Sequence, residues 1–236
     1  INGGGKVLQF GVADAVILMD GADYMTFDNL VVRNTLNNAN VKGFRIQNGS
    51  DYLTIKNCII EFSTLTSTST TSSAYIAYST SSTSSTTTSS TAHGSYNLIE
   101  KNLMRTTNVN SPGPAFGIAI QGSNSTYSST AQDNTINGNT IQNFYSTAIR
   151  LYNTNGVQVL NNDISRSNAT SYNSSSTLYG IRSDYSYATS RATKLEGNNL
   201  HDWPFSGATT ASAPSTVYAF YTYFNYGNAS YKFSLS

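Results

Sequence analysis

The sequence predicts an all-β solenoid, a fold in which one short structural unit recurs along the chain and stacks on itself. Three observations indicate this. A six-residue frame occurs six times, a second family of apolar segments alternates with it, and β-branched, aromatic and turn-forming residues dominate the composition. The 236 residues suffice for one large domain, and we expect a single domain over residues 1–236.

The six-residue frame has apolar residues at its first and sixth positions. Its third position holds Asn or Gly in every copy except one, which has Lys101. Asn and Gly tolerate a left-handed backbone, so each copy is predicted to form a tight turn between two short strands. The copies start at Phe27, Ile55, Ile99, Ile136, Val159 and Leu195.

The fourth position of the frame becomes asparagine in the later copies. Strand side chains alternate between two faces, so the fourth and sixth positions face the same way, into the core. A buried amide finds partners when the same amide lies above and below it, about 4.8 Å away. We therefore predict a structural asparagine ladder, preceded by Leu30 and Cys58 and made of Asn102, Asn139, Asn162 and Asn198.

The second strand family lies between successive copies of the frame. Intervals between copies vary from 23 residues, between Ile136 and Val159, to 44 residues, between Ile55 and Ile99. A constant core with variable insertions is typical of a solenoid with loops at fixed corners. We expect Ser/Thr-rich loop insertions within 63–95, 165–177 and 208–216. The second-family segments begin at Val16, Phe44, Ala74, Gly117, Ala148, Tyr179 and Tyr218.

Several columns should form when the copies stack. Tyr24, Tyr52 and Tyr96 lie three residues before their copies and should stack as aromatic rings. The outward series Arg33, Glu61, Arg105 alternates in charge, which favours ion pairs between turns of the solenoid. The series Val31, Ile59, Leu103 forms an outward apolar column.

The stretches "DGADYMTFDNLVVRN" (20–34) and "NGSDYLTIKNCIIEFS" (48–63) resemble the right-handed parallel β-helix repeats of the pectate-lyase-like superfamily. They are most similar to large secreted or cell-surface repeat proteins of Bacteroidota and related bacteria. The resemblance spans about residues 14–235 and implies a single right-handed parallel β-helix of about seven coils, secreted or at the bacterial cell surface. The superfamily includes polysaccharide lyases, glycoside hydrolases, phage tailspikes and adhesins, so the resemblance implies a fold more than a function.

The composition argues against two kinds of partner, nucleic acid and the membrane interior. Only 11 % of residues are charged and the net charge is +1, which argues against nucleic acid. The longest strongly apolar run, 15–19, is too short for membrane insertion. The final "YKFSLS" (231–236) reads as the start of another coil. We expect either an excerpt of a longer chain or coils that associate end to end or laterally with other copies.

Arg150 and Arg182 occupy equivalent outward positions in successive second-family strands, and Asp184 lies two residues beyond. In a lyase, an arginine beside a bound uronate can abstract a proton, which makes these three residues catalytic candidates. The alternative is a solvated face in which Asp184 and Asp163 balance the arginines, and we favour it.

Asp20, Asp23 and Asp51 are candidate calcium ligands, since Asp23 and Asp51 should lie on adjacent coils. The alternative, which we favour, is that each aspartate caps a turn. We accordingly expect no cofactor, with calcium the one metal to consider. The two histidines, His93 and His201, are too few for a zinc site.

Tyrosines crowd the C-terminal half of the chain. Tyr185, Tyr187, Tyr221 and Tyr223 are candidates for contacts with carbohydrate or with a protein partner. The alternative is that they cover the flank of the coil beneath the loops.

Two classes of function follow. The first is a non-enzymatic extracellular module, acting as a rigid spacer, adhesin or filament subunit. The second is a carbohydrate-active enzyme or polysaccharide-binding protein. Ice binding ranks last, because Thr26, Thr54 and Thr135 offer only an interrupted column.

Overall fold

The computed structural model describes residues 1–66, 68–87, 93–108, 111–122, 131–166, 175–203, 216–223, 225–227 and 233–235. Every regular element in these ranges is a β-strand. No helix that could span a bilayer occurs within them. The predicted insertions at 165–177 and 208–216 lie mostly outside the described residues, as does part of the insertion at 63–95.

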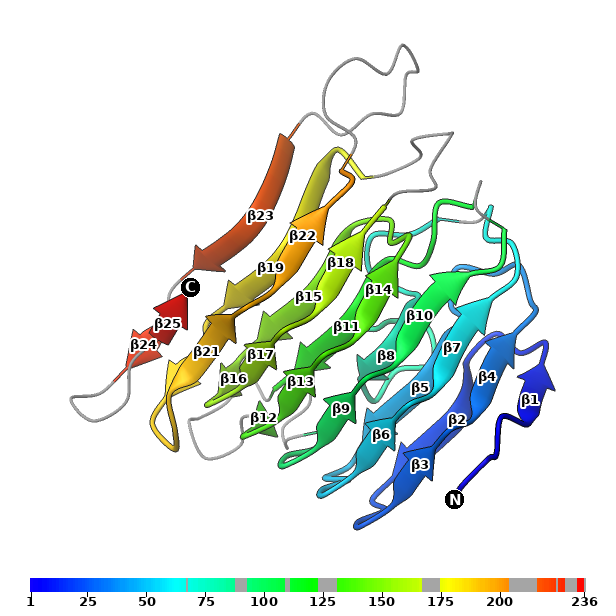
Figure 1. The fold of residues 1–236 in the computed structure, drawn as a ribbon, viewed down its shortest axis with the longest axis horizontal. Helices are drawn as coiled ribbons and strands as arrows, with labels where there is room; N and C mark the ends of the chain where they lie inside the picture. The colour runs from blue at the N-terminus through cyan, green and yellow to red at the C-terminus, as the bar shows by residue number, and fades with distance from the viewer. Residues whose placement is uncertain are drawn as a thin grey trace.

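Three seven-stranded parallel sheets, named A, B and C, extend along the length of the molecule (Figure 1), together with a four-stranded sheet D. Sheet A contains β3 (Thr26–Asp28), β6 (Thr54–Lys56), β9 (Leu98–Glu100), β13 (Thr135–Asn137), β17 (Gln158–Leu160), β21 (Thr193–Glu196) and β25 (Phe233–Leu235). Sheet B contains β1 (Val7–Phe10), β4 (Val31–Asn34), β7 (Ile59–Phe62), β10 (Leu103–Thr106), β14 (Thr140–Gln142), β18 (Asp163–Ser165) and β22 (Asn199–His201).

Sheet C forms the layer behind these two in Figure 1, and a short sheet D joins it at one corner. Sheet C contains β2 (Ala15–Asp20), β5 (Lys42–Gln47), β8 (Ala74–Tyr78), β11 (Phe116–Gln121), β15 (Thr147–Tyr152), β19 (Thr177–Asp184) and β23 (Thr216–Tyr223). Sheet D contains β12 (Ala131–Gln132), β16 (Thr154–Asn155), β20 (Tyr187–Ala188) and β24 (Tyr226–Gly227). The chain visits C, A and B in turn and pairs each strand with its equivalent one turn later, which fits a parallel β-helix solenoid.

The register of sheets A and B follows the six-residue frame of the sequence. First positions pair in one column, from Phe27 with Ile55 to Val159 with Leu195, and sixth positions pair in another. The third position has positive φ in all six copies, including Lys101 at 53°. The predicted strand–turn–strand unit is therefore confirmed, even where lysine replaces the usual Asn or Gly.

The asparagines at the fourth position form one continuous hydrogen-bonded column. Each side-chain oxygen accepts bonds from the backbone N–H and the amide nitrogen of the preceding asparagine, at 2.9–3.0 Å from Asn102 through Asn139 and Asn162 to Asn198. The same amide nitrogens donate to strand carbonyls inside the coil, Asn139 to Ile99 at 2.9 Å for example. At the other end, the Cys58 N–H donates to the Asn102 oxygen at 2.9 Å.

A second, shorter amide column was not anticipated from the sequence. The Leu53 N–H donates to the Asn97 side-chain oxygen at 2.7 Å, and the Asn97 N–H donates to that of Asn134 at 3.0 Å. Both asparagines are buried. With only two members, this column leaves too weak a repeat to be recognised in the sequence.

Tyr24, Tyr52 and Tyr96 stack as the sequence predicts. Ring centroids of neighbours are 4.8 and 4.9 Å apart, and the planes are nearly parallel. All three residues have positive φ and all three are exposed, so the stack is a ridge on the surface. Contact between rings compensates part of the cost of the left-handed backbone at these turns.

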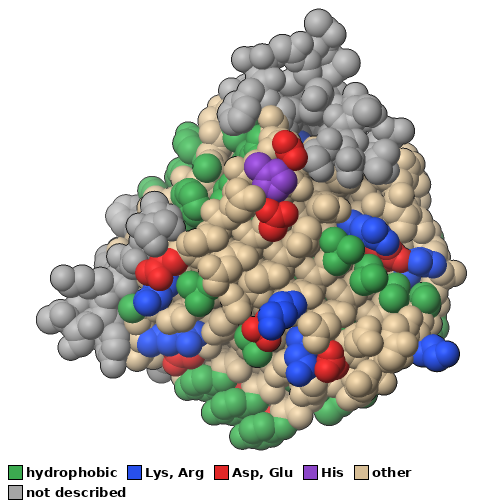
Figure 2. Space-filling view, in the orientation of Figure 1, with side chains coloured by type: hydrophobic (Ala, Val, Ile, Leu, Met, Phe, Trp, Pro, Cys, Tyr) green, Lys and Arg blue, Asp and Glu red, His purple; other side chains and the backbone are tan. Residues whose placement is uncertain are grey.

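Charged residues connect successive strands on the outer face of sheet B. Glu61 is 2 % exposed and pairs with Arg33 on one side and with Arg105, at 3.2 Å, on the other. The neighbouring apolar column predicted at Val31, Ile59 and Leu103 continues to Val7, which is 52 % exposed. Figure 2 shows charged side chains of both signs in small groups on this face, amid polar surface and some hydrophobic side chains.

Candidate functional site on sheet C

Arg150 and Arg182 lie on adjacent strands of sheet C and point away from the core. They pair directly in register, and Tyr221 of β23 follows them in the same column. Their chain neighbours Ile149, Leu151 and Ile181 are fully buried, as strand alternation requires. The structure thus brings the two predicted arginines together on the outer face of the sheet, and Asp184, the third catalytic candidate, lies beside them.

Arg182 is held in place by a carboxylate and two aromatic rings. Its Nε donates to the Asp184 Oδ2 at 2.7 Å, and the Asp184 side chain is only 2 % exposed. Its guanidinium lies 4.8 Å from the Tyr179 ring centroid and 5.4 Å from that of Tyr221. Cation–π contacts of this kind stabilise a charged group that has lost part of its hydration.

Arg150 is packed differently. Its guanidinium lies 5.8 Å from the Phe116 ring centroid and 5.3 Å from that of Tyr152. Its Nε is shielded from solvent without a hydrogen-bond partner, and it forms no ion pair with any described residue. Burial and the adjacent Arg182 lower the pKa of Arg150, although an arginine stays charged at neutral pH.

A cavity of about 240 Å³ opens over these arginines. Its wall combines the two guanidinium groups, one aromatic ring and several hydroxyl groups. The lining residues are Thr70, Thr71, Phe116, Ser146, Thr147, Arg150 and Arg182. Thr70 and Thr71 come from the insertion between β7 and β8, so the cavity is built from segments far apart in the sequence.

The balance of charge predicted for this face is partly wrong. Asp184 does pair with Arg182, but Asp163 lies on sheet B, where its Oδ1 is 3.0 Å from His201 Nε2 and accepts a bond from Asn199. Asp163 therefore does not neutralise the arginines. Asp163 faces outward as strand alternation requires, but on sheet B and not on the sheet that carries the arginines.

The four candidate tyrosines separate into distinct places. Tyr221 contacts Arg182. Tyr185 and Tyr223 extend a row of edge-to-face rings that begins at Tyr152, with centroids 5.6 Å apart at each step. Tyr152 also contacts Arg150, so this row adjoins the arginine cavity. Tyr187 instead lies in sheet D, paired with Tyr226 of β24.

The three candidate calcium ligands accept hydrogen bonds from neighbouring turns. Asp20 accepts from the Asn48 amide, Asp23 from the Asp51 N–H at 2.9 Å, and Asp51 from the Ser95 N–H at 2.7 Å. Burial and the charge of Asp23 raise the pKa of Asp51, and the hydrogen bond from the Ser95 N–H partly offsets this rise. No group of three or more His, Cys, Asp or Glu side chains positioned for a metal occurs in the part of the chain that the structure describes. These aspartates connect one coil to the next.

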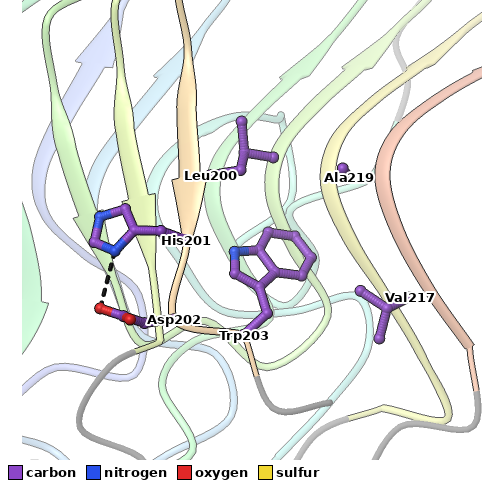
Figure 3. Close-up of a pocket in the computed structure, with 6 residues that line it drawn as sticks. All are labelled: Leu200, His201, Asp202, Trp203, Val217 and Ala219. Atoms are coloured by element: carbon purple, nitrogen blue, oxygen red, sulfur yellow. Dashed lines mark hydrogen bonds and ion pairs between the residues drawn. The ribbon is translucent and has the colours of Figure 1, made fainter.

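A second cavity, of about 200 Å³, lies between β22 and β23 (Figure 3). Leu200, Trp203, Val217 and Ala219 line it, with His201 and Asp202 at one side. The His201 ring lies 2.9 Å from Asp202 and 3.0 Å from Asp163, and these carboxylates raise its pKa. The sequence places His201 outward, but gives no signal for its two carboxylate partners.

The chain was compared with models of known protein families and with curated proteins, and neither comparison finds a match.

Proposed function

We propose that the protein is a non-enzymatic extracellular or cell-surface module that acts as a rigid structural, adhesive or filament-forming unit. The proposal extends to the finer architecture: a right-handed parallel β-helix of about seven coils with Ser/Thr-rich insertions, akin to the pectate-lyase-like superfamily and its bacterial surface proteins. Its partners would be other copies of the same protein or polysaccharide.

One observation carries this proposal: carboxylate and amide side chains that could serve in catalysis or metal binding instead form hydrogen bonds and ion pairs between successive coils. Asp23 and Asp51 accept backbone N–H groups of the next turn. Glu61 bridges two arginines from neighbouring strands, and the asparagine column runs through four coils. Such columns restrain both bending and unwinding, because each coil is attached to its neighbours by buried polar contacts as well as by the sheets.

Exposed apolar and aromatic surface supports lateral association as the way such units would assemble. The column at Val7, Val31, Ile59 and Leu103 runs along the outside of sheet B. The Tyr24, Tyr52 and Tyr96 ridge runs in the same direction, along the helix axis. Contiguous apolar surface of this kind is typical of interaction sites.

Electron microscopy of the native polypeptide tests the structural role. We expect long stalks or fibres, with subunits aligned along the coil axis. Dispersed globular particles at every concentration examined would contradict the proposal.

Carbohydrate-active chemistry or polysaccharide binding is the second candidate, favoured by the Arg150–Arg182 cavity and its aromatic surroundings. An activity screen on uronate polymers, with and without added calcium, separates it from the first. A lyase would release a product that absorbs in the ultraviolet through its new double bond, whereas a non-enzymatic module would release none.

A further inference from the structure

We infer that the cavity over Arg150 and Arg182 is an oxyanion-binding site, which takes a carboxylate or sulfate group, free or carried on a sugar. This inference holds whether the chain is a structural module or an enzyme.

The first argument is an uncompensated charge. Arg150 and Arg182 together carry two positive charges, and Asp184 is the one carboxylate paired with them among the described residues. The pair therefore keeps one excess positive charge at a half-buried position. Burying a charge without a partner is costly, and proteins usually pair such a group or neutralise it. An arginine does not lose its proton at neutral pH, so binding of an anion, and not deprotonation, would compensate this charge.

The second argument comes from an internal comparison. Arg45 lies in the same outward column of sheet C, separated from Arg150 by Ala77 and Ala119. The Nε of Arg45 is buried without a partner, like that of Arg150, but its two terminal nitrogens have acceptors: they contact Asp14 at 2.8 Å, Gln47 at 2.5 Å and the Thr80 carbonyl at 3.2 Å. Where the fold uses an arginine of this column structurally, it supplies acceptors. Around Arg150, the described residues place two ring faces and the charge of Asp184, which already pairs with Arg182, but no hydrogen-bond acceptor.

The third argument is the geometry of the donors. The Phe116 and Tyr152 rings are 5.8 and 5.3 Å from the Arg150 guanidinium and offer no strong acceptor for its N–H groups. The in-plane N–H groups of a guanidinium match the two oxygens of a carboxylate or sulfate. Hydroxyl groups of Thr70, Thr71, Ser146 and Thr147 on the same wall add further donors.

Size limits the ligand. The cavity of about 240 Å³ is smaller than the ~300–1,000 Å³ of pockets that enclose drug-sized molecules. It fits one anionic group, or a single acidic residue of a polymer whose neighbours extend along the surface. The adjoining Tyr152, Tyr185 and Tyr223 row offers rings over which such neighbours can pack.

Titration calorimetry at constant ionic strength, with chloride as the background anion, tests the inference. The probes are inorganic sulfate, galacturonate and, as the uncharged match, galactose. We expect saturable binding of sulfate or galacturonate and none of galactose. Tighter binding of galacturonate would identify an acidic sugar as the source of the oxyanion, and tighter binding of sulfate would identify a sulfate group.

Arg150→Met is the decisive variant, because it removes the unpaired charge while keeping an apolar side chain against the two rings. We expect binding to weaken about tenfold or more, as loss of a charged hydrogen-bond donor does, with an unchanged or higher melting temperature. Arg150→Lys, which keeps the charge without the planar fork, should bind between the two. Arg105→Gln removes one exposed arginine on sheet B and should bind like the unmodified protein.

Two results would overturn the inference: no saturable binding of either anion to the unmodified protein, or unchanged anion binding in Arg150→Met. Because calorimetry reads binding alone, a failure here leaves the structural role to be judged by microscopy, and the two conclusions stay separable.

Discussion

The buried amide column makes a quantitative prediction for Asn139→Ala. The Asn139 Oδ1 accepts two bonds from Asn102, at 3.0 and 2.9 Å, and its Nδ2 donates to the Ile99 carbonyl and to the Asn162 Oδ1 at 2.9 and 3.0 Å. The Nδ2 also donates to the Asn137 carbonyl at 3.3 Å, and alanine removes all five bonds. It leaves the Asn102 N–H and the Ile99 carbonyl inside the coil without these partners.

Each buried polar group left without a partner costs ~1–3 kcal/mol. The Ile99 carbonyl stays paired in the ladder of sheet A, so one such group, the Asn102 N–H, is left without a partner. With the lost amide–amide bonds and a small cavity, we expect a loss of about 2–4 kcal/mol in the free energy of unfolding. Truncation of a buried side chain alone would cost less, since only a few atoms are removed.

Asn137→Ala is the matched control. Asn137 lies two residues earlier on the opposite face, half-buried, where its amide donates to Glu100 at 3.1 Å and its oxygen accepts from Asn161 at 3.2 Å. Water replaces both contacts, so we expect a loss of no more than about 0.5–1 kcal/mol.

Urea denaturation of the two variants and the unmodified protein, followed by circular dichroism, measures the difference. If Asn139→Ala falls within about 1 kcal/mol of Asn137→Ala, the buried amide groups find other partners or water. The column would then not stabilise the coil stack as reasoned here.

Three further predictions follow from buried or paired charges. Burial lowers the pKa of Lys42 from 10.5 to about 8, so the folded state binds this proton less tightly than the unfolded state. The free energy of unfolding should therefore rise between about pH 8 and 10.5, by up to about 3 kcal/mol. Urea titrations of Lys42→Met should lack this rise. Glu61→Gln breaks ion pairs with Arg33 and Arg105, whose side chains are 33 % and 43 % exposed and can therefore be hydrated. We expect the free energy of unfolding, measured with urea, to fall by about 1–3 kcal/mol. A loss near zero would refute the bridging role of Glu61. Asp202 and Asp163 raise the pKa of His201 above 6.5, so the ion pairs of His201 stabilise the fold below pH 6.5 and this stabilisation disappears as pH rises through the raised pKa. An NMR titration should place the midpoint of His201 above 6.5, and Asp163→Asn should lower that midpoint.

The sequence predicts the register of sheets A and B because that register is local and repeated. An apolar residue at each end of the frame and a left-handed turn between them recur six times. An irregular residue in one copy therefore does not obscure the pattern that the other copies share. Even Lys101, which breaks the turn pattern, adopts the same backbone, because neighbouring coils impose it. The tyrosine stack is predictable for the same reason: each ring stands at a fixed distance from the frame.

Features built from insertions are not predictable in this way. The Nζ of Lys42 is buried against the Asn40 and Ser82 carbonyls, and Ser82 belongs to an insertion with no repeat partner. The arginine cavity depends on Thr70 and Thr71 in the same manner. The sequence can place Arg150 and Arg182 in one outward column, but it does not specify which residues of an irregular loop approach them.

The outward column of sheet C shows how a solenoid can combine support and recognition in a single fold. Along that column the residues are Leu18, Arg45, Ala77, Ala119, Arg150, Arg182 and Tyr221. All occupy one backbone position, so backbone geometry cannot distinguish them. Ala77 and Ala119 are fully buried and Arg45 nearly so, whereas Arg150 and Arg182 are half-buried beside an open cavity. What differs is whether the rest of the protein supplies hydrogen-bond acceptors to the arginine. A substitution that loses anion binding without loss of stability is therefore expected at Arg150 and not at Arg45. Arg45→Met, which removes the ion pair with Asp14 and the bond to the Thr80 carbonyl from a nearly buried side chain, should lower the melting temperature, while Arg150→Met should not. Equal losses in the two variants would show that Arg150 is structural after all.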